Sequence, residues 1–120
     1  PGAGGTQTLA RALGERRAKE LIMSARRFDA NEAKAWGLVN EVVGQEQLLD
    51  EVLQTAARIA ANAPIAVRQA RHAIHRGLQM SLADGLAFEI EAYNRTVPTD
   101  DRREGVKAFN EKRIPEFKGE

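Results

Sequence analysis

The sequence predicts an all-α fold of about six helices with one short strand. Three observations lead to this prediction. Apolar residues recur at spacings of three and four along most of the chain, the period of a helix that buries one face. Glycines and prolines fall between these periodic segments, where helices start or end. Only 5% of the 120 residues are aromatic, and abundant alanine favours helices.

The first 45 residues are predicted to hold three short helices, over residues 6–13, 15–24 and 29–36. Gly14 and Gly37 each follow a periodic segment, where glycine is the preferred residue after a helix end. Asp29 and Glu32 have the spacing of a capping box. Residues 38–43 read Leu-Val-Asn-Glu-Val-Val and are the only β-like run, so they predict the short strand.

The remaining residues predict longer helices. Residues 46–61 carry an apolar stripe typical of an amphipathic helix. Pro64 is placed to begin the next helix, which ends near residue 77, because the missing N–H costs nothing in a first turn. Ser81 with Asp84 predicts a cap for a further helix, whose apolar stripe continues to residue 97. A last helix follows a cap at residue 99 or 100 and ends at residue 110 or 112.

Composition excludes several classes of protein. With 29% charged and 42% hydrophobic residues the chain is neither a disordered tail nor a membrane protein. The formal net charge of +1 gives no general attraction to nucleic acid or to an anionic membrane. The absence of cysteine excludes disulfides, thiol nucleophiles and cysteine-based zinc sites, and it fits a reducing compartment.

The Gly-rich opening, residues 1–7, is the first candidate site. Its three glycines permit a sharp turn, and two interpretations follow. It is either a flexible turn between packed elements or a helix N-terminus whose N–H groups hold an anion, a water or a carbonyl oxygen. The residues alone favour the flexible turn. A phosphate loop is excluded because Thr6-Gln7, rather than a Lys-Ser or Lys-Thr pair, follows the glycines.

Two further groups of side chains are candidate binding sites. The helix after Pro64 places Arg68, Arg71, His72, His75 and Arg76 on or beside one face. A solvated face is favoured there over phosphate or RNA contact, because the sequence shows no interleaved aromatic residues. Metal binding is not expected, since no nearby cysteine or carboxylate completes a ligand set around the two histidines.

Phe109 and Lys112, near the C-terminus, are three residues apart and would share a helix face. An aromatic ring beside a flexible cation can stack on an adenine and meet its phosphate. A solvated helix stabilised by charge pairs is the alternative, and spacing alone leaves both open.

Three ordered motifs resemble the enoyl-CoA hydratase/isomerase (crotonase) superfamily. Residues 1–7 are similar to its P-G-x-G-G-T-Q-R-L segment, with Thr8 where the family often has arginine. Residues 18–22 followed by 33–39 resemble its A-x-E-L…A-x-x-x-G-L-V stretch. Residues 100–119 look like its D-x-x-E-G…A-F-x-E-K-R…F-K-G signature. Residues 80–82 and 97–99 look most like methylglutaconyl-CoA hydratase-like members.

The resemblance implies the C-terminal part of a crotonase-type α/β spiral. Residues 1–27 would end the spiral core, and residues 28–120 would form a helical region that drives homotrimers, or hexamers made of two trimers. The implied reaction adds water across the 2,3 double bond of a 2-enoyl-CoA. Its two glutamates and its oxyanion hole would lie upstream, so we expect this chain to be an inactive C-terminal fragment on its own.

The resemblance also implies site residues. Gly2 matches the position whose backbone N–H helps to hold the water. Tyr93, Phe109 and Lys112 match positions that line the CoA pocket, with Tyr93 where a phenylalanine is common. No separate cofactor is expected, because coenzyme A is part of the acyl-CoA substrate.

Three alternatives stay open at this point. The first is a non-catalytic helical oligomerisation module, in which the stripes at residues 48–59 and 82–97 pack between subunits. The second is an enoyl-CoA isomerase or another crotonase branch, because the residues that separate these reactions lie upstream. The third is RNA binding through the face at residues 68–76, although nucleic acid and membrane are not expected partners. A bacterial cytoplasmic location is favoured, or the mitochondrial matrix in a eukaryote.

Overall fold

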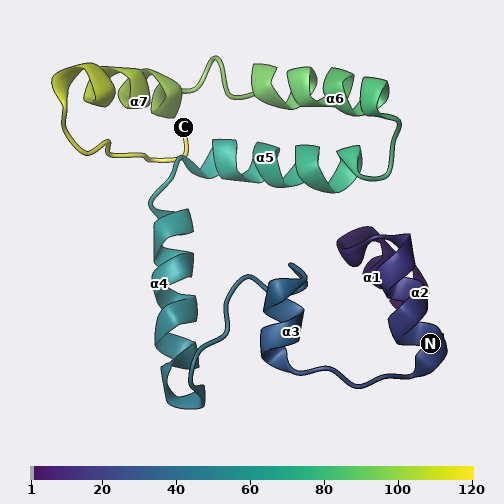
Figure 1. Ribbon diagram of the computed structural model, residues 1–120. Helices are drawn as coiled ribbons and strands as arrows, with labels where there is room; N and C mark the ends of the chain where they lie inside the picture. The colour runs from purple at the N-terminus through teal and green to yellow at the C-terminus, as the bar shows by residue number, and fades with distance from the viewer. Residues whose placement is uncertain (1) are drawn as a thin grey trace. The chain divides into compact units, whose positions relative to one another are not determined.

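The computed structural model describes residues 2–120, and the regular secondary structure within them is all helical (Figure 1). The predicted all-α class is therefore confirmed for the described residues. Seven α-helices and one short 3-10 turn occur there, in the order α1 (Gly5–Leu13), α2 (Glu15–Ser24), α3 (Ala30–Ala35), η1 (Gln45–Gln47), α4 (Leu48–Ala60), α5 (Pro64–Gly77), α6 (Leu82–Asn94) and α7 (Asp100–Glu111).

The predicted strand over residues 38–43 is wrong. After α3, Gly37 takes a φ of +78°, and the Leu38 N–H donates to the Ala33 carbonyl at 2.8 Å. The chain then runs through bends and irregular backbone to η1. A strand needs a partner to complete its ladder of hydrogen bonds, and the part of the chain that the structure describes contains none. The apolar run is β-like in composition only.

The chain divides into two compact units, Pro1–Leu48 and Leu49–Glu120. In the first, α1 and α2 pack against each other across Gly14, whose φ of +81° reverses the chain in a single residue. Ala18 and Leu21 of α2 are buried in this unit, as is Ala33 of α3. The predicted division at residues 27 and 28 refers to the larger fold implied by the resemblance, and it stays a prediction.

In the second unit, α5 and α6 form an antiparallel pair (Figure 1). The two helices approach closely at Gly77 and Gly85, where a Cβ added to Gly85 would stand 3.5 Å from the Gly77 Cα. Ala92 is the buried residue of α6. Small side chains therefore set the spacing of this pair, as the alanine-rich sequence predicts.

The three predicted side-chain caps are confirmed, whereas the helix predicted from residue 46 begins at Leu48, after the 3-10 turn. The Glu32 N–H donates to Asp29 Oδ1 at 2.8 Å, and the Asp29 N–H donates to Glu32 Oε2 at 3.1 Å, which completes a capping box. Ser81 accepts from the Asp84 N–H, and Thr99 accepts from the Arg102 N–H, each at 3.2 Å. Thr99, rather than residue 100, is therefore the cap of α7. Each start depends on residues only three apart, which makes it readable from sequence.

Little apolar surface is buried within residues 2–120. The buried hydrophobic residues there are Ala18, Leu21, Ala33, Ala92 and Ala108. By contrast, α4 has no buried residue, and the large side chains of its apolar stripe are more than half exposed, namely Leu48, Leu49, Val52, Leu53 and Ile59. Within the described residues, this stripe is therefore a contiguous exposed apolar surface.

Candidate functional site

The Gly-rich turn leads directly into α1. Gly4 takes a φ of +87°, and its carbonyl accepts hydrogen bonds from the N–H groups of Gln7 and Thr8 at 3.0 and 2.9 Å. Gly2 is exposed, and no heavy atom lies within 4 Å of the place where its Cβ would stand. The backbone here is therefore accessible to a ligand. Pro1, the first residue of the predicted motif, lies outside the described residues.

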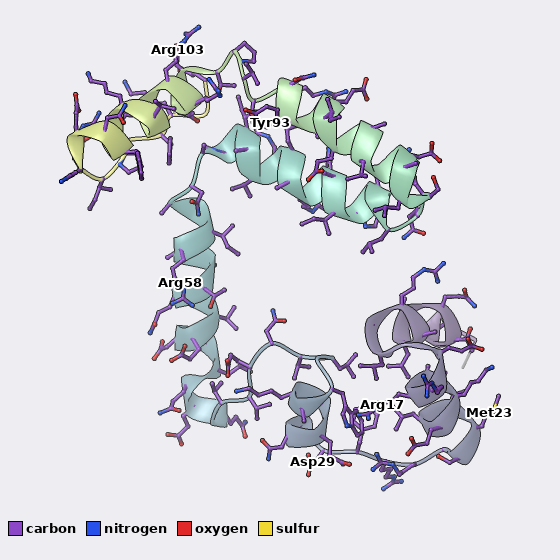
Figure 2. The ribbon with its side chains drawn as sticks, turned by 45° about the horizontal axis from the view of Figure 1, so that its top comes forward. Arg17, Met23, Asp29, Arg58, Tyr93 and Arg103 are labelled. Carbon is purple, nitrogen blue, oxygen red and sulfur yellow. The ribbon has the colours of Figure 1, made fainter. Side chains whose placement is uncertain are left out.

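Tyr93 lies near the C-terminal end of α6, beside the start of α5 (Figure 2). It lines a mainly apolar groove of about 630 Å³ between these helices, together with Ala70, Ala73, Ile90 and Thr96. The Tyr93 carbonyl accepts from Thr96 Oγ1 at 2.7 Å, which helps to end the helix. The groove does not include Phe109 or Lys112, so the structure does not bring all three predicted coenzyme A residues together in one hollow.

Phe109 and Lys112 both lie at the C-terminal end of α7. Phe109 is 84% exposed, the Lys112 N–H donates to the Phe109 carbonyl at 3.3 Å, and Lys112 follows the last helical residue with a left-handed φ of +54°. The sequence prediction assumed that Lys112 belongs to the helix and shares a face with Phe109. The structure instead places it at the turn that ends the helix, so its side-chain direction depends on that turn.

Beyond Lys112 the chain folds back along α7 as an irregular segment, residues 113–120, which we call the C-terminal segment (Figure 1). Glu104 of α7 forms a two-pronged ion pair with Arg113, with N–O distances of 2.6 and 2.9 Å. It also accepts from the Glu116 N–H at 2.9 Å. A Cβ added to Gly105 would stand 3.5 Å from the Phe117 ring.

The far end of the C-terminal segment is fixed by Asp101, whose surface is only 3% exposed. Its two carboxylate oxygens accept from the N–H groups of Lys118 and Gly119 at 2.7 and 2.8 Å. The Asp101 N–H donates in turn to the Glu120 carbonyl at 3.1 Å. A buried carboxylate is therefore satisfied by the backbone of the segment that it holds.

Sequence reasoning missed this folded segment, although a signal for it exists. Asp101, Glu104 and Gly105 stand at spacings of three and four, so they lie on one face of α7. Carboxylates on that face can accept from backbone N–H groups, and a glycine beside them permits close approach of another segment. The sequence interpretation placed the acids among solvated charges instead.

Three ion pairs each lower the pKa of a glutamate, namely Arg113 with Glu104, Arg26 with Glu32 and Lys34 with Glu41. The Arg113 guanidinium, followed by the Glu116 amide, lowers the pKa of Glu104 to about 2, and the same pair raises the pKa of Arg113. In the first unit, Arg26 pairs with Glu32 at 2.9 Å, which lowers the pKa of Glu32. Glu104 and Glu32 therefore stay ionised to a lower pH than an isolated glutamate.

Trp36 is the centre of a cation–π group in the first unit. The guanidinium groups of Arg17 and Arg26 lie 4.8 and 5.2 Å from its ring centroid, and the Phe28 ring lies 5.2 Å away. Sequence reasoning identified Trp36 only as a helix end, because the four residues come from three separate segments. The group fixes the connection between α2 and α3.

The basic face of α5 gains an aromatic neighbour in the structure. Phe88 of α6 lines a hollow of about 370 Å³ with Arg71, His72, His75 and Arg76. The sequence interpretation noted no interleaved aromatic, since Phe88 comes from another helix. Solvation of this face stays a prediction.

Metal-ligating clusters and membrane-spanning helices are both absent from the described residues. His, Asp and Glu side chains within residues 2–120 form no group of three or more that could hold a metal ion. No helix in that part of the chain is both long and apolar enough to cross a membrane.

Comparison with known proteins decides the family. The family profile described as enoyl-CoA hydratase/isomerase matches residues 1–120. The chain belongs to the enoyl-CoA hydratase/isomerase family. A crystal structure of enoyl-CoA hydratase from Bacillus anthracis superposes on the chain with a TM-score of 0.95 and 52% identity, covering 100% of this chain and 46% of that one. The chain therefore corresponds to the helical C-terminal part of the crotonase fold.

Two relatives place the chain within this family. The protein YngF of Bacillus subtilis (strain 168) is 54% identical over 119 residues, which are 99% of this chain and 46% of YngF. Human mitochondrial methylglutaconyl-CoA hydratase is 48% identical over 124 residues, which cover 100% of this chain and 37% of that protein. The chain thus spans less than half the length of these crotonase relatives. The chain is 54% identical to YngF and 48% identical to human methylglutaconyl-CoA hydratase, so its sequence identity to YngF is higher.

Proposed function

We propose that this chain is the C-terminal portion of an enoyl-CoA hydratase-type enzyme, which adds water across the 2,3 double bond of a 2-enoyl-CoA thioester. The observation that carries this proposal is the match to hydratases along the whole chain, at 48% identity to human methylglutaconyl-CoA hydratase and 52% to the Bacillus anthracis enzyme. The parent is thus a carbon–oxygen lyase.

The proposed reaction divides its chemistry between this chain and the preceding half. Water attacks C3 of the enoyl group while a proton is delivered to C2, and the thioester oxygen carries negative charge in the transition state. Two upstream glutamates would handle the water and the proton. From this chain we assign only the backbone N–H of Gly2, which would help to position the water. Its exposed, unobstructed backbone supports that role.

On the coenzyme side, we assign Phe109 and Lys112 to the adenosine phosphate end and Tyr93 to the wall of the CoA site. The high exposure of Phe109 beside Lys112 supports the first assignment, since a ring and a cation lie free at one helix end. Tyr93 lies in a separate groove, so it would meet the same ligand only if another subunit or the upstream half completes the site.

Assembly into a homotrimer, or a hexamer of two trimers, is the third part of the proposal. The exposed apolar stripe of α4 supports it, because such a stripe is stable in water when another surface covers it. We place the enzyme in the cytoplasm of a bacterium, or in the mitochondrial matrix of a eukaryote.

A non-catalytic oligomerisation module is the second candidate, and the same α4 stripe favours it. An isomerase or another crotonase branch is the third. These candidates differ in what the full-length protein does with 2-enoyl-CoA and 3-enoyl-CoA thioesters. A module leaves both unchanged, whereas an isomerase shifts the double bond of a 3-enoyl-CoA without adding water.

The test compares the full-length protein with the isolated 120-residue chain on crotonyl-CoA, following loss of the conjugated thioester and formation of the 3-hydroxyacyl product. We expect hydration by the full-length protein and none by the isolated chain. A full-length protein that gives no hydroxyacyl product contradicts the proposed reaction. Hydration by the pure 120-residue chain contradicts the assignment of the catalytic acids to the upstream half.

A further inference from the structure

The C-terminal segment does more than end the chain, and we propose that it positions Lys112. Specifically, the Glu104–Arg113 ion pair and the Asp101 backbone contacts hold the turn at Lys112, and thereby direct its ammonium toward the phosphates of a coenzyme A thioester. Glu104, Arg113 and Asp101 are positioning residues in this inference, because they act through Lys112 and do not touch the ligand. The inference rests on the proposed function.

The turn at Lys112 has a left-handed backbone conformation. Lys112 is one of two non-glycine residues with positive φ among those described. Such a conformation crowds the Cβ against the backbone, and here hydrogen bonds from the Lys112 N–H to the Ala108 and Phe109 carbonyls help to keep it. A continued helix would instead point Lys112 along the same face as Phe109. The direction of the ammonium therefore depends on what holds the turn closed.

Arg113 holds the turn on the side next to Lys112. Its N–H donates to the Ala108 carbonyl at 3.0 Å, and its guanidinium binds Glu104 through two nitrogens. The guanidinium also contacts Glu111 through Nε at 2.7 Å. Arg113 is thus bonded to α7 at three separate points, and a planar guanidinium fixes direction as well as distance.

Glu104 extends the hold into the C-terminal segment. The same carboxylate that binds Arg113 accepts from the Glu116 N–H, so it joins two parts of the segment to one point of α7. Arg113 is also the largest cause of the low pKa of Glu104. The carboxylate therefore stays charged, and the ion pair intact, throughout the neutral range.

Asp101 anchors the other end, one turn nearer the start of α7. It accepts from two successive backbone N–H groups, a geometry that fixes the segment without using its side chains. The segment ends beside the start of α5, where a Cβ added to Gly119 would stand 3.5 Å from Pro64 Cγ. The two ends of α7 are therefore coupled through residues 113–120, and the turn at Lys112 cannot open without breaking one of these contacts.

The test uses the full-length enzyme and two substrates that carry the same acyl group on different thiols. Crotonyl-CoA carries the adenosine phosphates, whereas crotonyl-N-acetylcysteamine lacks them. We expect Arg113→Gln to raise the KM for crotonyl-CoA about tenfold with kcat nearly unchanged. The KM for the truncated thioester stays at the unmodified value. Glu104→Gln, which leaves the shape of the side chain intact, is expected to show the same selective rise.

Arg103→Gln is the matched control, since it removes the same kind of side chain from the same helix. Arg103 forms an exposed ion pair with Asp100 and makes no contact with the C-terminal segment among those described. Its kinetics on both thioesters should match those of the unmodified enzyme. Amide exchange at Glu116 then checks the structural step, because its protection should fall in the Arg113 and Glu104 variants only.

Three results would overturn the inference. Equal loss on both thioesters would make Arg113 a general stabilising residue, and no change on either would remove its role. Turnover of neither thioester by the unmodified enzyme would overturn the proposed function, and this inference with it. The first two results leave hydration by the unmodified enzyme intact, so the failures are distinguishable.

Discussion

Helices α4 and α7 belong to the same compact unit, are similar in length, and obtain their stability in opposite ways. Helix α7 is covered on one face by the C-terminal segment of its own chain, with a carboxylate buried at the contact. Helix α4 presents an apolar stripe that nothing in residues 2–120 buries. The covering of α7 therefore comes from its own chain, whereas nothing among the described residues covers the α4 stripe.

The largest expected effect comes from placing a charge on the apolar stripe of α4. Leu53→Glu places a charge on the apolar stripe, where Leu53 is 56% exposed in the isolated chain. If another subunit or the upstream half covers the stripe, the full-length enzyme should lose its assembly, because an unpaired buried charge costs several kcal/mol. Light scattering of the full-length protein measures the loss.

Gln54→Glu is the control for this change, since it adds the same charge to the polar face of α4 and should leave assembly intact. The isolated chain should melt at the same temperature with either substitution, because the side chains are exposed there. An unchanged assembly of the Leu53→Glu enzyme would show that α4 is not an interface.

The next effect concerns the anchor of the C-terminal segment. Asp101→Ala leaves the N–H groups of Lys118 and Gly119 without their acceptor, which should reduce the free energy of unfolding of the second unit by about 1–3 kcal/mol. Urea unfolding of the isolated chain measures the loss. Asp100→Ala is the neighbouring control, because Asp100 is exposed and contacts only Arg103 through its side chain among the described contacts. Equal losses from both variants would contradict the anchoring role.

Acid should release the middle of the same segment. The pKa of Glu104 is lowered to about 2 in the folded chain, from 4.5 in its ordinary state. Its contribution to stability is therefore fully present above pH 4.5 and is lost as the pH falls toward about 2, because the unfolded chain takes up the proton first.

Urea unfolding across this acid range measures that contribution. Glu104→Gln should flatten the dependence of the unfolding free energy on pH. Glu91→Gln, an exposed carboxyl of α6, should leave the Glu104 component in place. Identical pH curves for the unmodified chain and the Glu104→Gln chain would rule out the ion pair as its source.

The smallest expected effect concerns the contact between α7 and the C-terminal segment. Gly105→Ala should stabilise the second unit by roughly 0.5–1 kcal/mol, since alanine favours the helix interior over glycine. The added methyl group would meet the Phe117 ring at 3.5 Å, which is ordinary packing distance. Calorimetry of the isolated chain measures the change. A net destabilisation would mean that the segment lies closer to α7 than the structure places it.

The features that the sequence predicted correctly are local ones. The caps at Asp29, Ser81 and Thr99 each require two residues three apart, and all three form. The turn glycines Gly14 and Gly37 likewise take positive φ at helix ends. A cap is decided within one helical turn, so nothing distant along the chain can overrule it.

The features that sequence reasoning missed depend on distant partners. The run at residues 38–43 has the composition of a strand, yet a ladder needs a second strand. Phe88 joins the α5 basic face only through pairing of two helices. For the candidate site, the sequence predicted a shared helical face for Phe109 and Lys112, but Lys112 lies at the left-handed turn that ends α7.

The cation–π group around Trp36 gives the chain a built-in optical probe. Trp36 is the single tryptophan and lies in the first compact unit, whereas the single tyrosine, Tyr93, lies in the second. Two guanidinium groups cover the indole, so parting of α2 from α3 would change its surroundings and its fluorescence. Each unit thus carries its own natural chromophore, and their unfolding can be followed separately in one unlabelled sample.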